Sequence, residues 1–188
     1  TVAVITGGTR GRGLGIAEAF AQAGAAVVVA SRSQASVDAA VQSIQAGGGR
    51  AAGMAVDVAE LAQMTALAEY AVAQFGQLDI WVNNAGTAGP YGPTLGNTPK
   101  DFTQVIQTNI LGVYHGSRAA MEYFVAQKRG KLINILGHGY NGPVPWQNAY
   151  ASSKAWTRSF TKALADETKD SGVGVYAFNP GLVLTDLL

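Results

Sequence analysis

The sequence contains no cysteine, only two histidines and few charged residues, and each shortage excludes a class of protein. Without cysteine there is no disulfide scaffold and no thiolate metal site, and two histidines are too few for an ordinary zinc site, so we expect no metal. Thirteen basic and twelve acidic residues leave a net charge of +1, which gives no electrostatic footprint for nucleic acid or an anionic membrane. No apolar run is long enough to span a membrane, and no signal peptide opens the chain. We therefore expect a soluble, cytoplasmic protein.

The 188 residues correspond in length to one ordinary domain, which we assign to residues 1–188. Hydrophobic residues make up 48% of the chain, enough for a single sizeable core and too many for a disordered protein. The chain opens on Thr1 without an initiator Met and stops in an apolar stretch at Leu188. Natural chains usually end in polar segments, so we interpret the sequence as a fragment at both ends.

Short apolar runs alternate with longer segments of helical period along the whole chain. The runs are continuously apolar, as is typical of parallel strands buried on both faces. Alternating strands and helices predict right-handed βαβ units and a doubly wound parallel sheet, an α/β fold of three layers. We expect strands at residues 2–6, 27–31, 51–56, 79–83, 131–136 and 173–178, and helices at about 13–23, 34–46, 60–75, 99–128 and 146–170.

A glycine-rich segment, Thr6-Gly-Gly-Thr-Arg-Gly-Arg-Gly13, links the first strand to the first helix. Glycines there allow a tight turn and let backbone N–H groups approach a phosphate at the helix N-terminus. The spacing matches neither G-x-G-x-x-G nor a P-loop, because Leu14 and Gly15 follow where a P-loop has Lys and Ser or Thr. That mismatch excludes a P-loop nucleotide triphosphatase. Taken alone, the segment is weak evidence for a phosphate site, since glycine turns between a strand and a helix are common.

The end of the second strand indicates which dinucleotide would bind. A site for NAD usually has Asp or Glu there to bond the ribose 2′-OH, whereas this sequence has Ser31 and Arg32. Arg32 and Arg10 could hold a 2′-phosphate through their guanidinium groups, or could be solvated surface residues. The missing acid and the two arginines predict NADP(H) in preference to NAD(H).

A tyrosine and a lysine, Tyr150 and Lys154, stand four residues apart at the start of the last predicted helix. This spacing places both side chains on one helix face. A cation beside a tyrosine favours the phenolate and so lowers its pKa toward the range useful for acid–base catalysis. By itself, such a pair is usually a solvated helix face.

Together these motifs resemble the classical type of the short-chain dehydrogenase/reductase family over the whole chain. The motifs, in family order, are Thr6-Gly-x-x-x-Gly-x-Gly13, Asp57, Asn83-Asn-Ala-Gly86, Asn109, Tyr150-x-x-x-Lys154 and Asn179-Pro-Gly181. The resemblance implies a Rossmann-like fold, an NAD(P)(H) cofactor and reversible hydride transfer between a carbonyl and an alcohol.

The resemblance also implies a role for each matching residue. Tyr150 would donate the proton, Lys154 would hold the ribose and lower the tyrosine pKa, and Asn109 would anchor a water of the proton relay. The cofactor would contact Gly7, Thr9, Arg10, Gly11, Gly13, Ser31, Arg32, Asp57, Val58, Asn84, Ala85, Gly86, Pro180, Gly181, Val183 and Thr185, besides Tyr150 and Lys154. Family members commonly pair two helices across a two-fold axis, so a homodimer or homotetramer is expected.

The sequence departs from the family pattern at two positions. The family usually has an apolar residue where Arg12 stands, so an extra cation lies beside the phosphates or faces solvent. The family's catalytic serine, at the end of the fifth strand, is replaced by Gly137, and no Ser or Thr occurs between Ser117 and Ser152. The candidates for a substitute donor are His138, Tyr140 and Asn141. Of these we favour His138 as a neutral donor, although a loop histidine beside glycines is more often simply exposed.

Two functions remain open. The first is an NADP(H)-dependent reductase of a ketone, aldehyde or ketoacyl substrate; the second is a cofactor-binding sensor or scaffold with little or no turnover. Gly137 favours the second, whereas the retention of Tyr150, Lys154 and Asn109 favours the first. A serine hydrolase is excluded, because no G-x-S-x-G segment is present. If the protein truly ends at Leu188, the family's last strand and substrate-covering region are missing, and the substrate cannot be identified.

Overall fold

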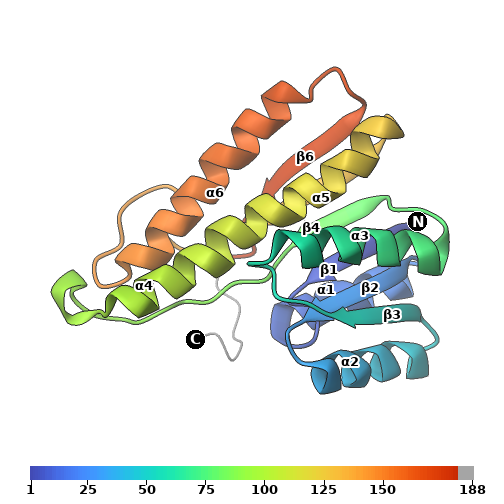
Figure 1. Ribbon diagram of the computed structural model, residues 1–188, viewed down its shortest axis with the longest axis horizontal. Coiled ribbons are helices and arrows are strands. Elements are labelled where there is room, and N and C mark those ends of the chain that lie inside the picture. The colour runs from blue at the N-terminus through green and yellow to red at the C-terminus, as the bar shows by residue number, and fades with distance from the viewer. Residues whose placement is uncertain (182–188) are drawn as a thin grey trace.

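The computed structural model describes residues 1–181 and contains a parallel sheet with helices on both faces (Figure 1). Its strand order, β3-β2-β1-β4-β5-β6, confirms the doubly wound α/β fold. The strands are β1 (Val2–Thr6), β2 (Ala26–Ser31), β3 (Arg50–Ala55), β4 (Ile80–Asn83), β5 (Gly130–Ile135) and β6 (Val173–Phe178). The helices are α1 (Gly11–Gln22), α2 (Gln34–Ala46), α3 (Leu61–Phe75), α4 (Pro99–Ile106), α5 (Gly112–Ala126) and α6 (Asn148–Glu167), with a 3₁₀ turn η1 (Thr94–Gly96) and a π-helical turn η2 (Gln107–Leu111).

The strands are apolar along their whole length because both faces of the sheet are covered. All five residues of β1 are buried, and successive side chains enter opposite cores. Ala3 and Ile5 pack with α1 and α2 on one face. Val4 packs on the other face with residues of α3 and α5, among them Leu67 and Phe124. Figure 1 shows α6 lying along the α4–α5 segment on this second side.

Buried polar side chains connect β4, β5, α5 and α6. The Asn83 amide accepts a hydrogen bond from Trp81 Nε1 (2.8 Å) and donates to Ser117 Oγ (3.1 Å) and Asn134 Oδ1 (2.8 Å). Asn134 in turn donates to Thr161 Oγ1 on α6 (3.0 Å). A buried amide without a partner would cost folding free energy, so each hydrogen bond in this series fixes the position of the next strand or helix. The network sets the position of α6, which carries the predicted tyrosine and lysine.

The predicted helix at 99–128 differs from the observed structure. Thr98 caps α4 as a Thr-Pro start should, since its hydroxyl accepts from the Asp101 backbone N–H (3.2 Å). The helix then widens into η2 around Asn109 before continuing as α5, and it ends at Ala126. A π-helical turn leaves no periodicity signal in the sequence. The last predicted helix is also shorter than expected, at 148–167 rather than 146–170.

The topology brings the irregular segments after β1 and β4 to one edge. These strands are neighbours in the sheet, and the crossovers leave them in opposite directions, toward β2 and toward β5. Open α/β sheets bind ligands at the carboxyl edge of such a pair. In the described part of the chain, no helix is both long and apolar enough to cross a membrane.

Candidate functional site

The loop between β1 and α1 can only be built with glycine at several positions. Gly7 and Gly11 have positive φ angles, 61° and 51°, which side chains disfavour. A Cβ on Gly13 would collide with the carbonyl oxygen of Gly7, so helix α1 begins directly against the loop. The Asn84 amide stabilises this arrangement by donating to the carbonyls of Thr6 and Gly7, both at 3.0 Å. The loop thus presents the N-terminus of α1 to the sheet edge, as a phosphate site requires.

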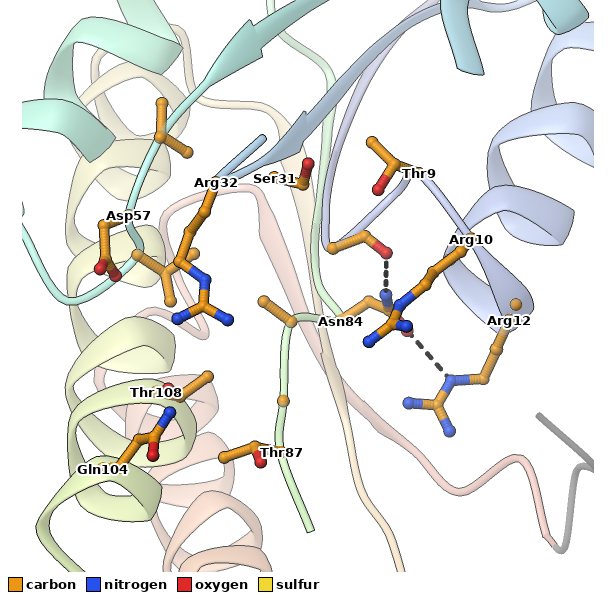
Figure 2. Close-up of a pocket in the computed structure, with 17 residues that line it drawn as sticks. Thr9, Arg10, Arg12, Ser31, Arg32, Asp57, Asn84, Thr87, Gln104 and Thr108 are labelled. Carbon is orange, nitrogen blue, oxygen red and sulfur yellow. Dashed lines mark hydrogen bonds between the residues drawn. The ribbon is translucent and has the colours of Figure 1, made fainter. Parts of the chain in front are cut away.

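A cleft of about 220 Å³ opens at this edge and contains most of the predicted cofactor contacts. Figure 2 shows Arg32 and Asp57 on one side and Arg10 and Arg12 on the other, with Asn84 between them. The predicted residues that line it are Gly7, Thr9, Arg10, Gly11, Gly13, Ser31, Arg32, Asp57, Val58, Asn84, Ala85 and Gly86. The lining residues absent from that prediction are Arg12, Val56, Thr87, Gln104 and Thr108. Of these, Gln104 and Thr108 share a helical face, a spacing that the sequence displays.

The end of β2 has the polarity expected for a phosphate-bearing cofactor. Arg32 is exposed, and Ser31 and Ser33 are engaged locally, with the Ser33 hydroxyl capping α2. The nearest lining acid, Asp57, is used by its own turn, where its carboxylate accepts from the Ala59 backbone N–H (3.0 Å). No carboxylate stands at the end of β2 itself, where a ribose 2′-OH would be recognised.

The predicted tyrosine and lysine are adjacent at the start of α6, with Lys154 Nζ 5.7 Å from the centre of the Tyr150 ring. Lys154 is buried, with only 3% of its surface exposed, and donates to the carbonyl of Ile135 at the end of β5 (3.0 Å). Burial, with a further effect from the charge of Arg12, lowers the pKa of Lys154 to about 8. Burial raises the pKa of Tyr150, whereas the charge of Arg12 lowers it. The pair therefore lies in an environment that perturbs both titrations, as is common in active sites.

Asn109 lies in η2, fully buried, and its amide is held by protein partners. Its two N–H groups donate to the Thr87 carbonyl (2.9 Å) and to Ser153 Oγ (3.0 Å), and its oxygen accepts from the Thr87 backbone N–H (2.9 Å). A Cβ on Gly86 would lie 3.4 Å from this oxygen and 3.9 Å from Lys154 Nζ. Asn109 thus connects the segment after β4 to α6. Its role as a water anchor stays a prediction, because both amide N–H groups are already donated.

Gly137 lies two residues after the end of β5 and packs against the Tyr150 side chain. A Cβ at this position would contact the Tyr150 hydroxyl oxygen, so the tyrosine packs on the glycine itself. Of the predicted substitute donors, His138 and Asn141 are exposed, and Tyr140 is half-buried beneath the Arg158 guanidinium (5.9 Å). None of the three lines the cleft described above, so the role of His138 also stays a prediction.

The remaining predicted contacts lie near the end of the described chain. Gly181 has a φ of 72°, and its backbone N–H donates to Asn179 Oδ1 (3.2 Å) just beyond β6. Pro180 is half-buried beside it. Val183 and Thr185 fall outside the described residues. Within residues 1–181 no three His, Asp or Glu side chains gather into a metal site.

Comparison with known proteins agrees with this geometry. The family described as short chain dehydrogenase matches residues 1–188. The 4-formylbenzenesulfonate dehydrogenase TsaC1/TsaC2 of Comamonas testosteroni is 38% identical over 100% of this chain and 74% of its own length. The probable chlorophyll(ide) b reductase NYC1, chloroplastic, of Arabidopsis thaliana is 34% identical, but the match covers 98% of this chain and only 41% of that protein.

Two solved structures with bound cofactor share the fold closely. A crystal structure of actinorhodin polyketide ketoreductase with NADPH has a TM-score of 0.94 at 30% identity, covering 99% of this chain and 72% of that one. A gluconate 5-dehydrogenase from Burkholderia cenocepacia, in complex with NADP and tartrate, has a TM-score of 0.93 at 32% identity, with the same coverage.

Proposed function

Because this chain belongs to the short-chain dehydrogenase family, we propose that it interconverts a small-molecule carbonyl and an alcohol with NADP(H) as its cofactor. The observation that carries the proposal is the convergence of two independent features on one sheet edge. The glycine loop after β1 accepts a hydrogen bond from the Asn84 side chain at the Gly7 carbonyl. Two residues further on, Gly86 lies beside the side chains of Asn109 and Lys154. Residues 84–86 therefore connect the proposed phosphate-binding loop with the proposed catalytic pair, Tyr150 and Lys154.

The glycine loop fits a dinucleotide because its shape excludes side chains where a phosphate would approach. Side chains at Gly7, Gly11 and Gly13 are disfavoured by backbone angle or by collision, which leaves the N-terminus of α1 accessible. NADP(H), when bound, supplies the hydride. The protein's own contribution is orientation and proton delivery: Tyr150 would give its hydroxyl proton to the substrate oxygen as the carbonyl carbon is reduced. Lys154, charged below a pH of about 8, would favour the resulting phenolate.

The preference for NADP(H) over NAD(H) rests on the two exposed arginines at the cleft. Arg32 ends the β2 side and Arg10 faces it from the glycine loop, while no carboxylate occupies the end of β2. Guanidinium groups suit a 2′-phosphate, whereas an acid there would repel it. The NADPH and NADP bound in the two structural neighbours support the same choice.

A cofactor-binding sensor or scaffold is the second candidate, and Gly137 is the observation that favours it. In the family resemblance this position carries a serine that bonds the substrate oxygen. Loss of one such donor from a preorganised site costs about 3–4 kcal/mol of transition-state stabilisation. His138 is the proposed substitute, since it follows Gly137 directly and its exposed ring could turn toward a bound substrate.

A homodimer or homotetramer built on α5 and α6 is also proposed. The Trp156 and Phe160 rings stack at 4.8 Å on α6, and Tyr114 of α5 meets Phe160 edge-on at 6.3 Å. Tyr114 of α5 and Leu111 of η2 are exposed by 40% and 39%, and Trp156 and Phe160 are half-buried, so an apolar surface remains partly uncovered along these helices. Light scattering would test it, with a monomer as the contradicting result.

We propose a cytoplasmic location, which cell fractionation would test.

The test of function is NADPH oxidation with a panel of ketones, aldehydes and ketoacyl thioesters, alongside Tyr150→Phe. A reductase predicts turnover with at least one substrate, lost in Tyr150→Phe. Tight NADPH binding without turnover on any substrate would favour the sensor or scaffold. Absence of both binding and turnover would leave only the fold and family. Gly137→Ser is a poor substitute for this panel, because its Cβ would displace the Tyr150 hydroxyl.

A further inference from the structure

Arg12 lines the cleft although it is absent from the predicted cofactor contacts. It is the second residue of α1 and follows Gly11 of the glycine loop directly, so it stands in the first turn of the helix. Its Nε donates to Asn84 Oδ1 at 3.0 Å. Figure 2 shows the side chain reaching from α1 toward Asn84. A cation therefore stands on the side of the cleft where the glycine loop would receive a phosphate.

The Asn84 side chain fixes both the glycine loop and Arg12. Its Nδ2 group donates to the carbonyls of Thr6 and Gly7, both at 3.0 Å. Because a carbonyl can only accept, the amide oxygen has to point the other way, toward the Arg12 guanidinium. Asn84 is buried, with 7% of its surface exposed, so the packing around it holds this orientation. The guanidinium is thus placed relative to the loop by the same side chain that shapes the loop.

Most of the hydrogen-bonding capacity of Arg12 is left over. A guanidinium has five N–H groups, and the bond to Asn84 uses the one on Nε. Within residues 1–181 Arg12 makes no second hydrogen bond and no ion pair, so the N–H groups on its two Nη atoms remain for a ligand. Arg12 is also half-buried. A partly buried charge without a counter-ion is costly, and the arrangement therefore favours an anion against these groups.

The charged side chains that line the cleft lie in two groups. Arg32 and Asp57 are on one side, and Arg10 and Arg12 are on the other (Figure 2). Among the described residues that line it, Asp57 is the one acid, and its carboxylate accepts from the Ala59 backbone N–H at 3.0 Å. Three guanidinium groups against one carboxylate suit a ligand that carries more than one phosphate group.

The places of the arginines indicate which phosphate each would contact. Arg32 follows the end of β2, where the adenosine ribose of a dinucleotide would lie. Arg12 is bonded to Asn84, beside the glycine loop and the N-terminus of α1, where a pyrophosphate would lie. A dinucleotide that spans the cleft would therefore bring its pyrophosphate, and not its 2′-phosphate, to the side of Arg12.

We propose that Arg12 is a cofactor-binding residue whose guanidinium, oriented by Asn84, binds the pyrophosphate of the dinucleotide through the N–H groups of its two Nη atoms. The inference rests on the proposed function. The 2′-phosphate that Arg32 would contact is present in NADPH and absent from NADH, whereas the pyrophosphate is common to both. Arg12 therefore raises the affinity for both dinucleotides without distinguishing between them.

Binding of both dinucleotides to Arg12→Met tests the assignment. We expect the Kd values for NADPH and NADH, measured by fluorescence titration, to rise by the same factor of about 30, the scale of one charge-assisted hydrogen-bonded pair. Arg12→Lys keeps a cation in the first turn of α1 and should regain part of this affinity. Arg50→Met, the matched control, removes an exposed arginine at the start of β3 and should leave both Kd values unchanged.

Three results of these titrations would overturn the inference. A loss confined to NADPH would mean that Arg12 contacts the 2′-phosphate. Unchanged Kd values for both dinucleotides would mean that Arg12 contacts neither phosphate group. Equal Kd values for Arg12→Lys and Arg12→Met would mean that the loss comes from a disturbed glycine loop rather than from the missing charge.

Inorganic pyrophosphate provides a second test that needs no dinucleotide. A ligand that binds the folded state raises the Tm, so we expect pyrophosphate to raise the Tm of the original protein and of Arg50→Met, and to have much less effect on Arg12→Met. Equal Tm shifts in all three proteins would overturn the inference. If the original protein binds neither NADPH nor NADH, the proposed function fails, while the pyrophosphate measurement still decides whether Arg12 binds this anion.

Discussion

The candidate site has two sides, which are held in place differently; the cleft lies on the side of the glycine loop, and Tyr150 and Lys154 lie outside its lining. On the side of β1 and β2, the proposed cofactor contacts are the backbone of the glycine loop and the exposed Arg10 and Arg32. On the side of β5 and α6, the proposed catalytic pair lies among buried polar side chains, namely Asn109, Ser153 and Lys154 itself. No buried side-chain nitrogen or oxygen in the described residues lacks a hydrogen-bond partner. We conclude that the first side depends on charge at the surface, whereas the second depends on the integrity of the core.

This difference predicts that substitutions on the two sides fail in different ways. Removing an exposed arginine should weaken a salt-sensitive binding step and leave folding intact. Removing a buried polar residue should change the free energy of unfolding, with a sign that depends on whether partners are left unsatisfied or a costly charge is removed.

The largest effect is expected for Asn83→Ala. The substitution leaves the Trp81 N–H and the Asn134 and Ser117 oxygens without their partner in the core. We expect the free energy of unfolding to fall by about 3 kcal/mol, measured by urea denaturation. Asn141→Ala, at an exposed loop position, is the matched control and should stay within about 0.5 kcal/mol of the original. Equal stability of the two variants would contradict the network's role.

Lys154→Met should raise the free energy of unfolding of the cofactor-free protein, in contrast to Asn83→Ala. Burial lowers the lysine pKa from 10.5 to about 8, so the folded state carries a charge that the unfolded state holds more favourably. That shift corresponds to about 3 kcal/mol, less about 1 kcal/mol for the lost bond to the Ile135 carbonyl.

The stability gained in Lys154→Met should depend on pH. Below pH 8 the lysine of the original protein is charged in both the folded and the unfolded state, so the variant shows its full gain in the free energy of unfolding there. The gain shrinks as pH rises from about 8 to 10.5, where both states become neutral. Unfolding measured at pH 7 and pH 10 checks this, with the exposed Lys162→Met on the same helix as control. An equal gain at both pH values would contradict a buried charge at Lys154.

The smallest effect is expected on the exposed side. Arg32→Ala should weaken NADPH binding about 10-fold while leaving NADH binding and the free energy of unfolding almost unchanged. The loss should diminish at high salt, since an exposed ion pair is screened. Fluorescence titration with both cofactors at two ionic strengths measures this. Equal losses for NADPH and NADH would show that Arg32 does not distinguish the 2′-phosphate.

Local signals in the sequence were sufficient to predict the sheet, because continuous apolar runs are typical of buried parallel strands. Most of the residues that line the cleft were predicted by the family resemblance, since the glycine segment alone is also consistent with an ordinary turn. The π-helical turn at Asn109 and the contact of Tyr150 with Gly137 depend on how distant segments pack. The hydrogen bond from Arg12 Nε to Asn84 Oδ1 also depends on the packing of distant segments, since nothing in the local sequence indicates it.

The most direct measurement is the NADPH dissociation constant of Tyr150→Phe, taken on the same preparation whose turnover is recorded. If the two sides of the candidate site have separate tasks, Tyr150→Phe binds NADPH within about 2-fold of the original while turnover falls by a factor of about 10³, the scale of a lost general acid. Loss of NADPH binding in step with turnover would contradict the account, because the lost turnover would then follow from lost cofactor rather than from lost proton delivery.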